Sequence, residues 1–234
     1  MKKPKTIFFT IIFVLFFISR LVSQNIYSKK LPEEFSGMKK SGDFLNYTGP
    51  KQLEIIRAAF DLLGKKNNEV ISIRDRKICL DCSGSVNAVF YLVGMDLLSI
   101  SSGYSGTGVQ ALYKSLDDLG RIYKKGMPKP ADLIFWSNTW DANGDGNNDN
   151  DPLTHVGLII KTREDGTIYY LHSHIKSGLI IQKMNLYNKE YYSYSGEKIN
   201  DAMAMGSYYG SEQNPENWTS GQLWTAFGDT ASLF

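Results

Sequence analysis

An α+β fold is predicted for this chain, with helices packed on an antiparallel sheet. Between residues 50 and 119, apolar side chains recur at helical spacing in three segments. After Gly126, short β-branched and aromatic runs alternate with Gly, Asp and Asn, which is typical of strands. The Asp165-Gly166 pair between two of these runs is a hairpin signal. Helices followed by a meander of strands predict segregated layers.

Length and composition permit one sizeable folded core. Hydrophobic residues make up 42% of the 234 residues and charged residues 21%, a composition that excludes disordered and fibrous proteins. Two fully independent domains would be cramped in a chain of this length.

The N-terminus predicts export. The first residues, MKKPK, are basic, and the apolar run 7–18 follows them. This run is shorter than the roughly 17 to 25 residues that a membrane-spanning helix needs, and Arg20 follows it almost at once. We therefore predict a signal peptide over residues 1–23 and a secreted, periplasmic or cell-envelope protein, with an uncleaved anchor as the alternative.

The positive charge of the chain belongs to this leader. Removing Lys2, Lys3, Lys5 and Arg20 changes the formal net charge from +2 to about −2. The remaining domain therefore has no overall basic character, whereas a nucleic-acid-binding protein is expected to carry a basic patch or stripe. Nucleic acids are accordingly excluded as partners.

The first half of the folded domain is predicted to contain three helices. Residues 24–50 lack periodicity and are interpreted as a linker or an N-terminal arm. The first helix is LEIIRAAFDLLG, which follows Pro50 and ends at Gly64. The second covers VNAVFYLVG and ends at Gly94, and the third covers residues 109–119.

The second half is predicted to form a sheet and then an extension. Four strands are expected, at 132–136, 155–161, 167–174 and 179–184. The folded domain is therefore assigned to residues 51–190. The remaining residues, 191–234, are rich in Tyr and Trp and are predicted only to pack on the domain.

The two cysteines of the chain, Cys79 and Cys82, lie in the run KICLDCSG. A C-x-x-C pair can indicate a redox motif or half of a zinc site, but no thioredoxin-like context is evident. Cys79 is expected to be a small buried residue. Cys82 lies at the predicted start of the second helix, where free N–H groups favour an anion, so we expect its thiol pKa to be lowered.

A thiol nucleophile needs a base, and the three histidines, His155, His172 and His174, all fall on the predicted meander. In a cysteine hydrolase an imidazole withdraws the thiol proton and a third group orients that imidazole. Backbone N–H groups hold the oxyanion. The amides of Cys82 and Ser83 are candidates for this last role.

The length of the hairpin loop decides whether the histidines share one face of the sheet. A two-residue loop places His172 opposite Ile159, and a four-residue loop places it opposite Gly157. Either loop keeps all three rings on one face, whereas a three-residue loop would split them. Register alone does not choose between His172 and His174 as the orienting group.

Four segments resemble, in order and wording, the NlpC/P60 family of cell-wall cysteine peptidases: LDCSGSVNAVFYLVG (80–94), KPADLIFW (129–136), HVGLII (155–160) and YYLHSH (169–174). The likeness spans about residues 51–184. Gln110 also falls where such domains often have a Thr-x-x-Gln helix.

The resemblance implies a papain-like fold and hydrolysis of amide bonds in peptidoglycan stem peptides. It assigns the nucleophile to Cys82, the base to His155 and the orienting role to His172. Asp81, Ser83 and His174 are expected at the oxyanion or substrate side. Peptidoglycan is the expected partner, and catalysis is expected to need no cofactor.

This chain differs from the family in two places. Family members usually carry a Tyr shortly before the nucleophile, whereas KKNNEVISIRDRKICLDCSG contains none, and Ala131 replaces the usual Gly. Three alternatives stand beside the peptidase: an amidase of the related CHAP type, a non-catalytic wall-binding module, and a calcium-stabilised surface interaction protein.

The insertion WDANGDGNNDND (140–151) separates two predicted strands and resembles a calcium loop. Pro152 stands where an EF-hand has its bidentate Glu. A solvated turn is the alternative, because Asn, Asp and Gly are common in loops. We expect a structural Ca²⁺ held by Asp141, Asn143, Asp145, Asn147, Asp149 and Asp151.

Overall fold

The computed structural model describes residues 35, 49–147, 149–203 and 215–233. The chain divides into two units, residues 1–44 and 45–234, and the fold below is that of the second unit. The predicted signal peptide and nearly all of the predicted arm lie outside the described residues. No helix in the described part is long and apolar enough to cross a membrane.

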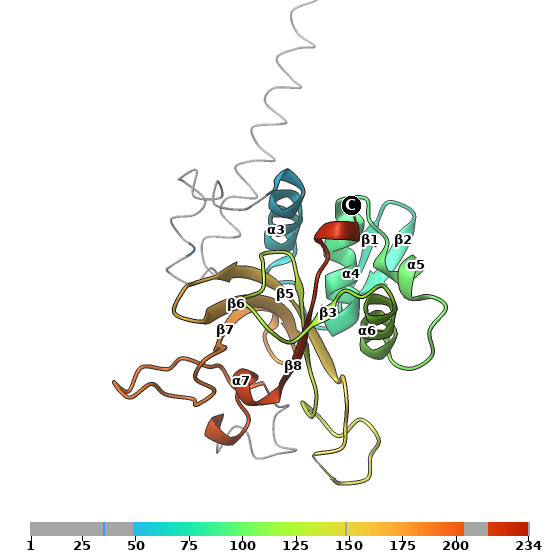
Figure 1. Cartoon of the computed structure of the whole chain (residues 1–234). Coiled ribbons are helices and arrows are strands. Elements are labelled where there is room, and N and C mark those ends of the chain that lie inside the picture. Colours follow the sequence, from blue (N-terminus) through green and yellow to red (C-terminus); the bar gives the residue numbers. More distant parts are fainter. Residues whose placement is uncertain (1–34, 36–48, 148, 204–214, 234) are drawn as a thin grey trace, which may run out of the picture. The chain divides into compact units, whose positions relative to one another are not determined.

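The second unit is α+β, as the sequence predicts (Figure 1). Its main sheet has six strands in the order β3-β8-β4-β5-β6-β7, and a separate sheet pairs β1 with β2. All pairings are antiparallel. The strands are β1 (Val70–Ile73), β2 (Arg76–Cys79), β3 (Ile122–Tyr123), β4 (Leu133–Trp136), β5 (His155–Thr162), β6 (Thr167–His174), β7 (Gly178–Asn185) and β8 (Trp224–Gly228).

The three predicted helices are present as α3 (Pro50–Leu62), α4 (Cys82–Leu92) and α6 (Gly108–Asp118). Pro50 occupies the first turn of α3, where its missing N–H costs no hydrogen bond. Gln110 closes a capping box with Thr107 at the start of α6, which gives the Thr-x-x-Gln spacing a structural reason. Short additional elements are α5 (Leu97–Ser101), α7 (Ser220–Leu223) and the 3₁₀ turns η3 (Pro215–Asn217) and η4 (Ala231–Leu233).

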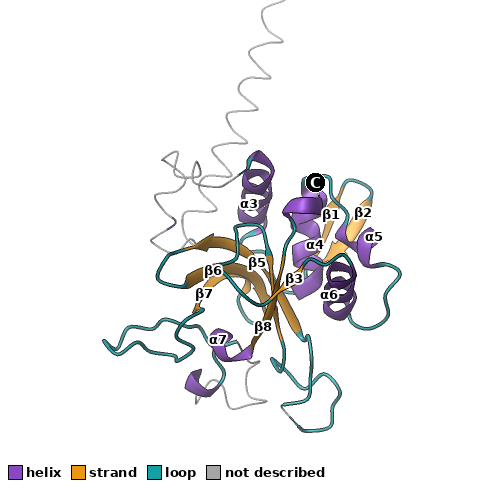
Figure 2. Ribbon diagram, viewed as in Figure 1, coloured by secondary structure: helices purple, strands orange, loops and turns teal. Residues whose placement is uncertain are grey.

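Different elements cover the two faces of the six-stranded sheet. Figure 2 shows α4 and α6 on one side of this sheet and α7 on the other. On the helix side, the rings of Phe135 and Tyr113 meet edge to face at 5.3 Å. Ser173 Oγ on β6 donates to the carbonyl oxygen of Leu80, just before α4. This face therefore positions the start of α4 against β5 and β6.

The opposite face carries a second core and the histidines. Trp136 and Tyr170 pack 4.8 Å apart there. His155 pairs with Trp136 across β4 and β5, and its ring lies 5.7 Å from the Trp136 ring. The core also includes Ile134, Ile159, Ile168, Met184, Met203 and Phe227, with Leu223 and Trp224 packed against it.

The C-terminal residues contribute an interior strand to the six-stranded sheet. Trp224–Gly228 form β8, which lies between β3 and β4. The sequence analysis assigned these residues only to an extension that packs on the domain. The run WTAFG is short and lacks a regular alternation, so its pairing with β4, about 90 residues earlier in the chain, had no local signal.

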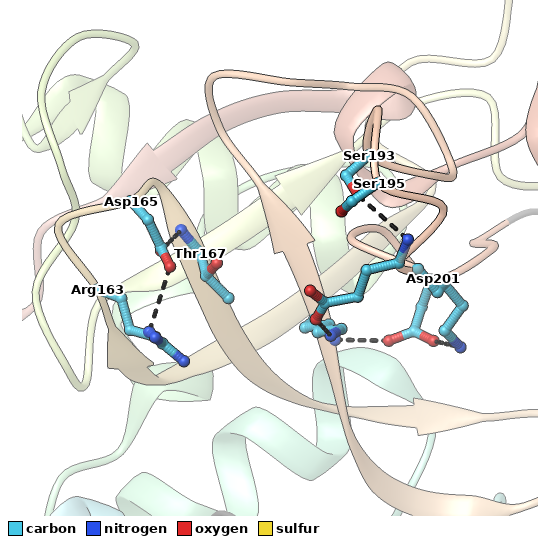
Figure 3. Close-up of polar contacts among 9 residues, drawn as sticks. Arg163, Asp165, Thr167, Ser193, Ser195 and Asp201 are labelled. Carbon is cyan, nitrogen blue, oxygen red and sulfur yellow. Dashed lines mark hydrogen bonds and ion pairs between the residues drawn. The ribbon is translucent and has the colours of Figure 1, made fainter.

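The β5–β6 hairpin has a three-residue loop, which is the length that should split the histidines between faces. The Arg163 amide donates to the Thr167 carbonyl oxygen and so encloses residues 164–166. Figure 3 shows Arg163, Asp165 and Thr167 at this turn, where the Asp165 carboxylate accepts the Thr167 N–H and pairs with Arg163.

A β-bulge at Ile160 restores the register that keeps the histidines together. Next to the loop, Thr162 pairs with Ile168. Beyond the bulge the register is shifted by one residue, and Leu158 pairs with Leu171. This register places His172 opposite Gly157, which is the arrangement predicted for a four-residue loop. A bulge next to a candidate site re-aims the side chains of one strand.

Candidate active site

The first turn of α4 presents two backbone N–H groups to Cys82. Asp81 is the N-cap: its Oδ1 accepts the Gly84 N–H at 2.7 Å, and its carbonyl oxygen accepts the Ser85 N–H at 2.9 Å. The remaining amides, those of Cys82 and Ser83, lie beside the Cys82 sulfur and lower its pKa. Donors at a helix start are suited to hold an anion or an oxyanion.

The Cys82 sulfur also touches the strand that carries His155. The backbone N–H of Val156, the residue after His155, lies close enough to the sulfur to lower its pKa. Val156 lies beyond the last registered β5–β6 pair, Leu158 with Leu171. Among the described residues no hydrogen bond joins the sulfur to the His155 ring, which packs against Trp136 on the sheet face opposite α4. A direct contact between the two groups would have to form when substrate binds, the stage at which catalytic hydrogen bonds often tighten.

Cys82 is a protonated thiol at neutral pH, contrary to our expectation of a lowered pKa. Burial, with a smaller contribution from the Asp81 carboxylate, raises the pKa of the thiol to about 11. The backbone N–H groups of Ser83, Val156 and Cys82 itself lower it, but by less. The expected effect of the helix start is therefore present, and removal of the thiolate from water outweighs it.

A chain of hydrogen bonds runs from His155 across the sheet to β7. His155 Nε2 and His172 Nδ1 are 2.9 Å apart, and His172 Nε2 and Gln182 Oε1 are 2.8 Å apart. Only 2% of His172 is exposed. The structure thus joins His155 to His172, a choice that strand register alone left open between His172 and His174.

Both linked histidines are neutral at pH 7. Burial, with a smaller contribution from the neighbouring His174, lowers the pKa of His155 from 6.5 to about 4. Burial likewise holds the pKa of His172 well below its ordinary value, with His155 and His174 adding to the decrease. A buried imidazolium would lack the solvation that water provides, so the uncharged form is favoured.

His174 lies beside this chain of hydrogen bonds without belonging to it. Its ring is 6.0 Å from the His172 ring, nearly perpendicular to it. Its Nδ1 accepts the backbone N–H groups of Lys176 and Ser177 in the β6–β7 turn. The Nδ1 atom of His174 is therefore occupied by the turn and is not available for a contact with substrate.

The side chains of Asp81 and Ser83 are engaged with each other. Ser83 Oγ donates to Asp81 Oδ1 at 3.0 Å, while the same carboxylate caps α4. A Cβ added at Gly108 would lie 2.5 Å from Ser83 Oγ, so the start of α6 packs closely on this hydroxyl. The Ser83 backbone N–H, rather than the side chain, is the part of this residue that lowers the pKa of the Cys82 thiol.

Two glycines of the recognised motifs are required by close packing. A Cβ at Gly84 would lie 1.9 Å from the carbonyl oxygen of Cys79. A Cβ at Gly157 would lie 2.9 Å from the Leu171 carbonyl oxygen and 3.2 Å from the Trp136 ring. Backbone atoms have little room to move in either place, so glycine lets α4 and β5 approach their neighbours.

Cys79 does not occupy the buried position that the sequence predicted. It is exposed, and its thiol makes only long contacts to the Asn68 carbonyl and side-chain oxygens, at 3.7 and 3.9 Å. It ends β2, a strand of the small hairpin that the sequence analysis missed. Both cysteines are free thiols.

The acidic loop is closed by hydrogen bonds from its own amides. Asp141 accepts the N–H groups of Gly144, Asp145 and Gly146, and Asp151 Oδ1 accepts those of Ala142 and Asn143. Within residues 35, 49–147, 149–203 and 215–233, no group of three His, Cys, Asp or Glu side chains is placed to hold a metal.

One atom of this loop nevertheless favours a cation. Asp151 is 2% exposed, and its Oδ2 is buried without a hydrogen-bond partner. An unpaired buried carboxylate oxygen is costly, and a Ca²⁺ ligated by the oxygens of the loop would satisfy it. The calcium site on Asp141, Asn143, Asp145, Asn147, Asp149 and Asp151 therefore stays a prediction.

Calcium is expected to raise the thermal midpoint of the chain through Asp151. At a free concentration of 100 times Kd, binding to the folded state alone adds about 2.7 kcal/mol of stability. Thermal melts with Ca²⁺, with Mg²⁺ and with a chelator measure the shift. The Asp151→Asn variant should lose the Ca²⁺ response; equal midpoints for the wild type in Ca²⁺ and in chelator would identify the loop as a solvated turn.

Comparison with known proteins found no family model, no curated protein and no solved structure that matches this chain.

Proposed function

We propose that this chain is a cysteine hydrolase of the NlpC/P60 type, with a papain-like arrangement of helix and sheet. The observation that carries the proposal is the meeting of Cys82, at the start of α4, with the first residues of β5, which bear His155. The hydrogen bond from His155 to the buried His172 supplies the orienting partner that such a base needs.

Acylation would begin from a neutral thiol and a neutral imidazole. The Cys82 sulfur attacks the carbonyl carbon of the scissile amide while His155 takes the thiol proton. Because His155 Nε2 is engaged with His172, the free nitrogen for this step is Nδ1. The N–H groups of Cys82 and Ser83, which lower the pKa of the thiol in the resting state, would stabilise the oxyanion.

The tetrahedral intermediate would collapse as His155 returns its proton to the leaving amine. This step breaks the C–N bond and leaves a thioester on Cys82. In deacylation, His155 removes a proton from water, whose oxygen attacks the thioester carbon. Collapse then releases the carboxylic acid product and restores the thiol.

Peptidoglycan stem peptides are the proposed substrates. Support comes from the four segments that resemble the family and from the leader-like N-terminus, which predicts export to the compartment that holds this polymer. The absence of the usual Tyr before the nucleophile leaves the CHAP-like amidase reaction as the alternative within the same chemistry.

Digestion of peptidoglycan fragments tests the proposed function. The purified chain is incubated with muropeptides, and the products are identified by mass spectrometry. We expect fragments cut within the stem peptide. Release of intact stem peptide from the sugar would establish the amidase instead, and uncut fragments after prolonged incubation would contradict hydrolysis of peptidoglycan.

A second candidate function, wall binding without catalysis, is favoured by one surface. Tyr187, Tyr192 and Tyr194 are 69%, 49% and 108% exposed, and they line a pocket of about 530 Å³ together with polar side chains. Aromatic rings beside hydrogen-bonding groups are suited to sugars. A wall pull-down that persists without any turnover by the wild type would select this function.

Polar contacts hold the segment that carries these tyrosines. Figure 3 shows Ser193, Ser195 and Asp201 beside β7: the two serine hydroxyls are 2.8 Å apart, and Asp201 accepts the Lys183 backbone N–H. Lys198 pairs with the same carboxylate. The segment is therefore fixed to the edge strand of the sheet.

A further inference from the structure

Gln182 lies at the far end of the hydrogen-bond chain that begins at His155. Gln182 is on β7 and pairs with Tyr170 on β6. Two residues along the same strands, His172 on β6 pairs with Ile180 on β7. Gln182 is thus the diagonal neighbour of His172 on the same face of the sheet, within reach of a long side chain. The 2.8 Å contact between His172 Nε2 and Gln182 Oε1 shows that this reach is used.

The amide oxygen determines which nitrogens of both rings carry protons. An amide oxygen only accepts, so His172 Nε2 must be protonated to bond to it. A neutral His172 then has an unprotonated Nδ1, which can only accept from His155. His155 Nε2 is therefore the donor, and its Nδ1 carries the lone pair.

We infer that Gln182 is a positioning residue that fixes the tautomers of His172 and His155, so that His155 presents an unprotonated Nδ1 as the base. This inference rests on the proposed function for its catalytic consequence, while the tautomer order itself stands on the two hydrogen bonds alone. This role is separate from that of His172. Without Gln182, the hydrogen bond between His172 and His155 could form with either ring as the donor.

Removal of the Gln182 side-chain oxygen should leave the fold unchanged, but the tautomers of His172 and His155 should no longer be fixed. In Gln182→Ala, His172 can adopt either tautomer, and the form with Nδ1–H would donate to His155 and place the His155 proton on Nδ1. We expect kcat on peptidoglycan fragments to fall about 10- to 100-fold with KM little changed, as for loss of a partner that orients a catalytic imidazole.

Gln182→Glu is the conservative rescue variant. A carboxylate accepts the same hydrogen bond from His172 and should keep the tautomer order and most of kcat. Its negative charge also favours imidazolium forms, so the acid limb of the rate profile should move to higher pH. The other titratable groups around the pair are His174, on the same strand, with Lys176 and Asp201 beyond it.

Nitrogen NMR of the histidine rings decides the inference without any activity measurement. The intact ¹⁵N-labelled chain should show Nε2–H and bare Nδ1 on both His155 and His172 at pH 7, and Gln182→Ala should show mixed tautomers. Ile181→Ala, next on β7 with its side chain on the other face, is the matched control and should keep the wild-type pattern.

Three outcomes are distinguishable. Wild-type rings protonated on Nδ1, or unchanged tautomers in Gln182→Ala, would overturn the role of Gln182. The expected tautomers with no hydrolysis by the wild type would leave the positioning intact and contradict the proposed function. A loss of kcat in Gln182→Ala that Ile181→Ala reproduces would identify an effect of strand packing and also overturn the inference.

Discussion

Cys82→Ala is expected to abolish hydrolysis, lowering kcat at least about 10⁴-fold. The start of α4 places the Cys82 sulfur beside backbone N–H groups and against β5. Alanine removes the atom that forms the thioester and leaves the Asp81 cap on Gly84 unaffected. Initial rates on muropeptides, measured by chromatography, check the prediction.

Cys79→Ala is the matched control for this experiment. Cys79 is the other free thiol, is exposed, and ends a strand of the small hairpin. We expect the hydrolysis rate of Cys79→Ala to stay within about two-fold of the wild-type rate, because substitutions of exposed residues away from a site have small effects. Equal activity of Cys82→Ala and wild type would rule out the thiol mechanism.

The raised pKa of Cys82 gives the same residue a second signature. Because burial holds the thiol protonated until about pH 11, its alkylation by a small reagent should be slow at pH 7 and accelerate steeply toward pH 11. A nucleophile that rests as an ion pair would react quickly at pH 7. The pH dependence of the alkylation rate therefore distinguishes a resting protonated thiol from a resting thiolate–imidazolium ion pair.

Local sequence patterns predicted the elements that carry the candidate site. Asp81, Cys82 and the apolar run after them indicate a capped helix, and α4 begins at Cys82 as predicted. The alternation around His155 and His172 indicates strands, which are present as β5 and β6. These features depend on residues within a few positions of each other, so periodicity and capping signals suffice.

Features set by contacts distant in sequence could not be predicted in this way. Strand β8 completes the sheet next to β4 from the far end of the chain. The bulge at Ile160, which offsets the three-residue loop, has no Gly or Pro to mark it. Gln182 could have been found only from the β6–β7 register, because alternation alone does not identify its partner.

The charge state of the site also depends on burial that the sequence does not reveal. A helix start favours the thiolate, and that contribution is present at Cys82. How far the fold removes the sulfur from water depends on the packing of α4 against β5 as well as on α4 itself. The sign of the pKa change therefore follows from tertiary packing, and the sequence supplies only the smaller of the two opposing effects.

His155→Ala should lower kcat about 10³-fold or more, because it removes the base for acylation and the acid for amine release. The wild type should in addition lose activity only as the pH falls through about 4, since the pKa of His155 is lowered to about 4 and its imidazolium cannot accept the thiol proton. Rates of both proteins from pH 3 to 10 measure these effects.

Folding must be followed over the same pH range, because the same group contributes to stability. The pKa of His155 is about 4 in the folded chain and 6.5 is its ordinary value, so the unfolded chain binds the extra proton between these limits. The free energy of unfolding should therefore decrease as the pH falls from 6.5 to 4, by at most about 3 kcal/mol from this group. Circular dichroism at each pH separates unfolding from protonation, and an acid limb near pH 6.5 in a fully folded protein would contradict the buried neutral base.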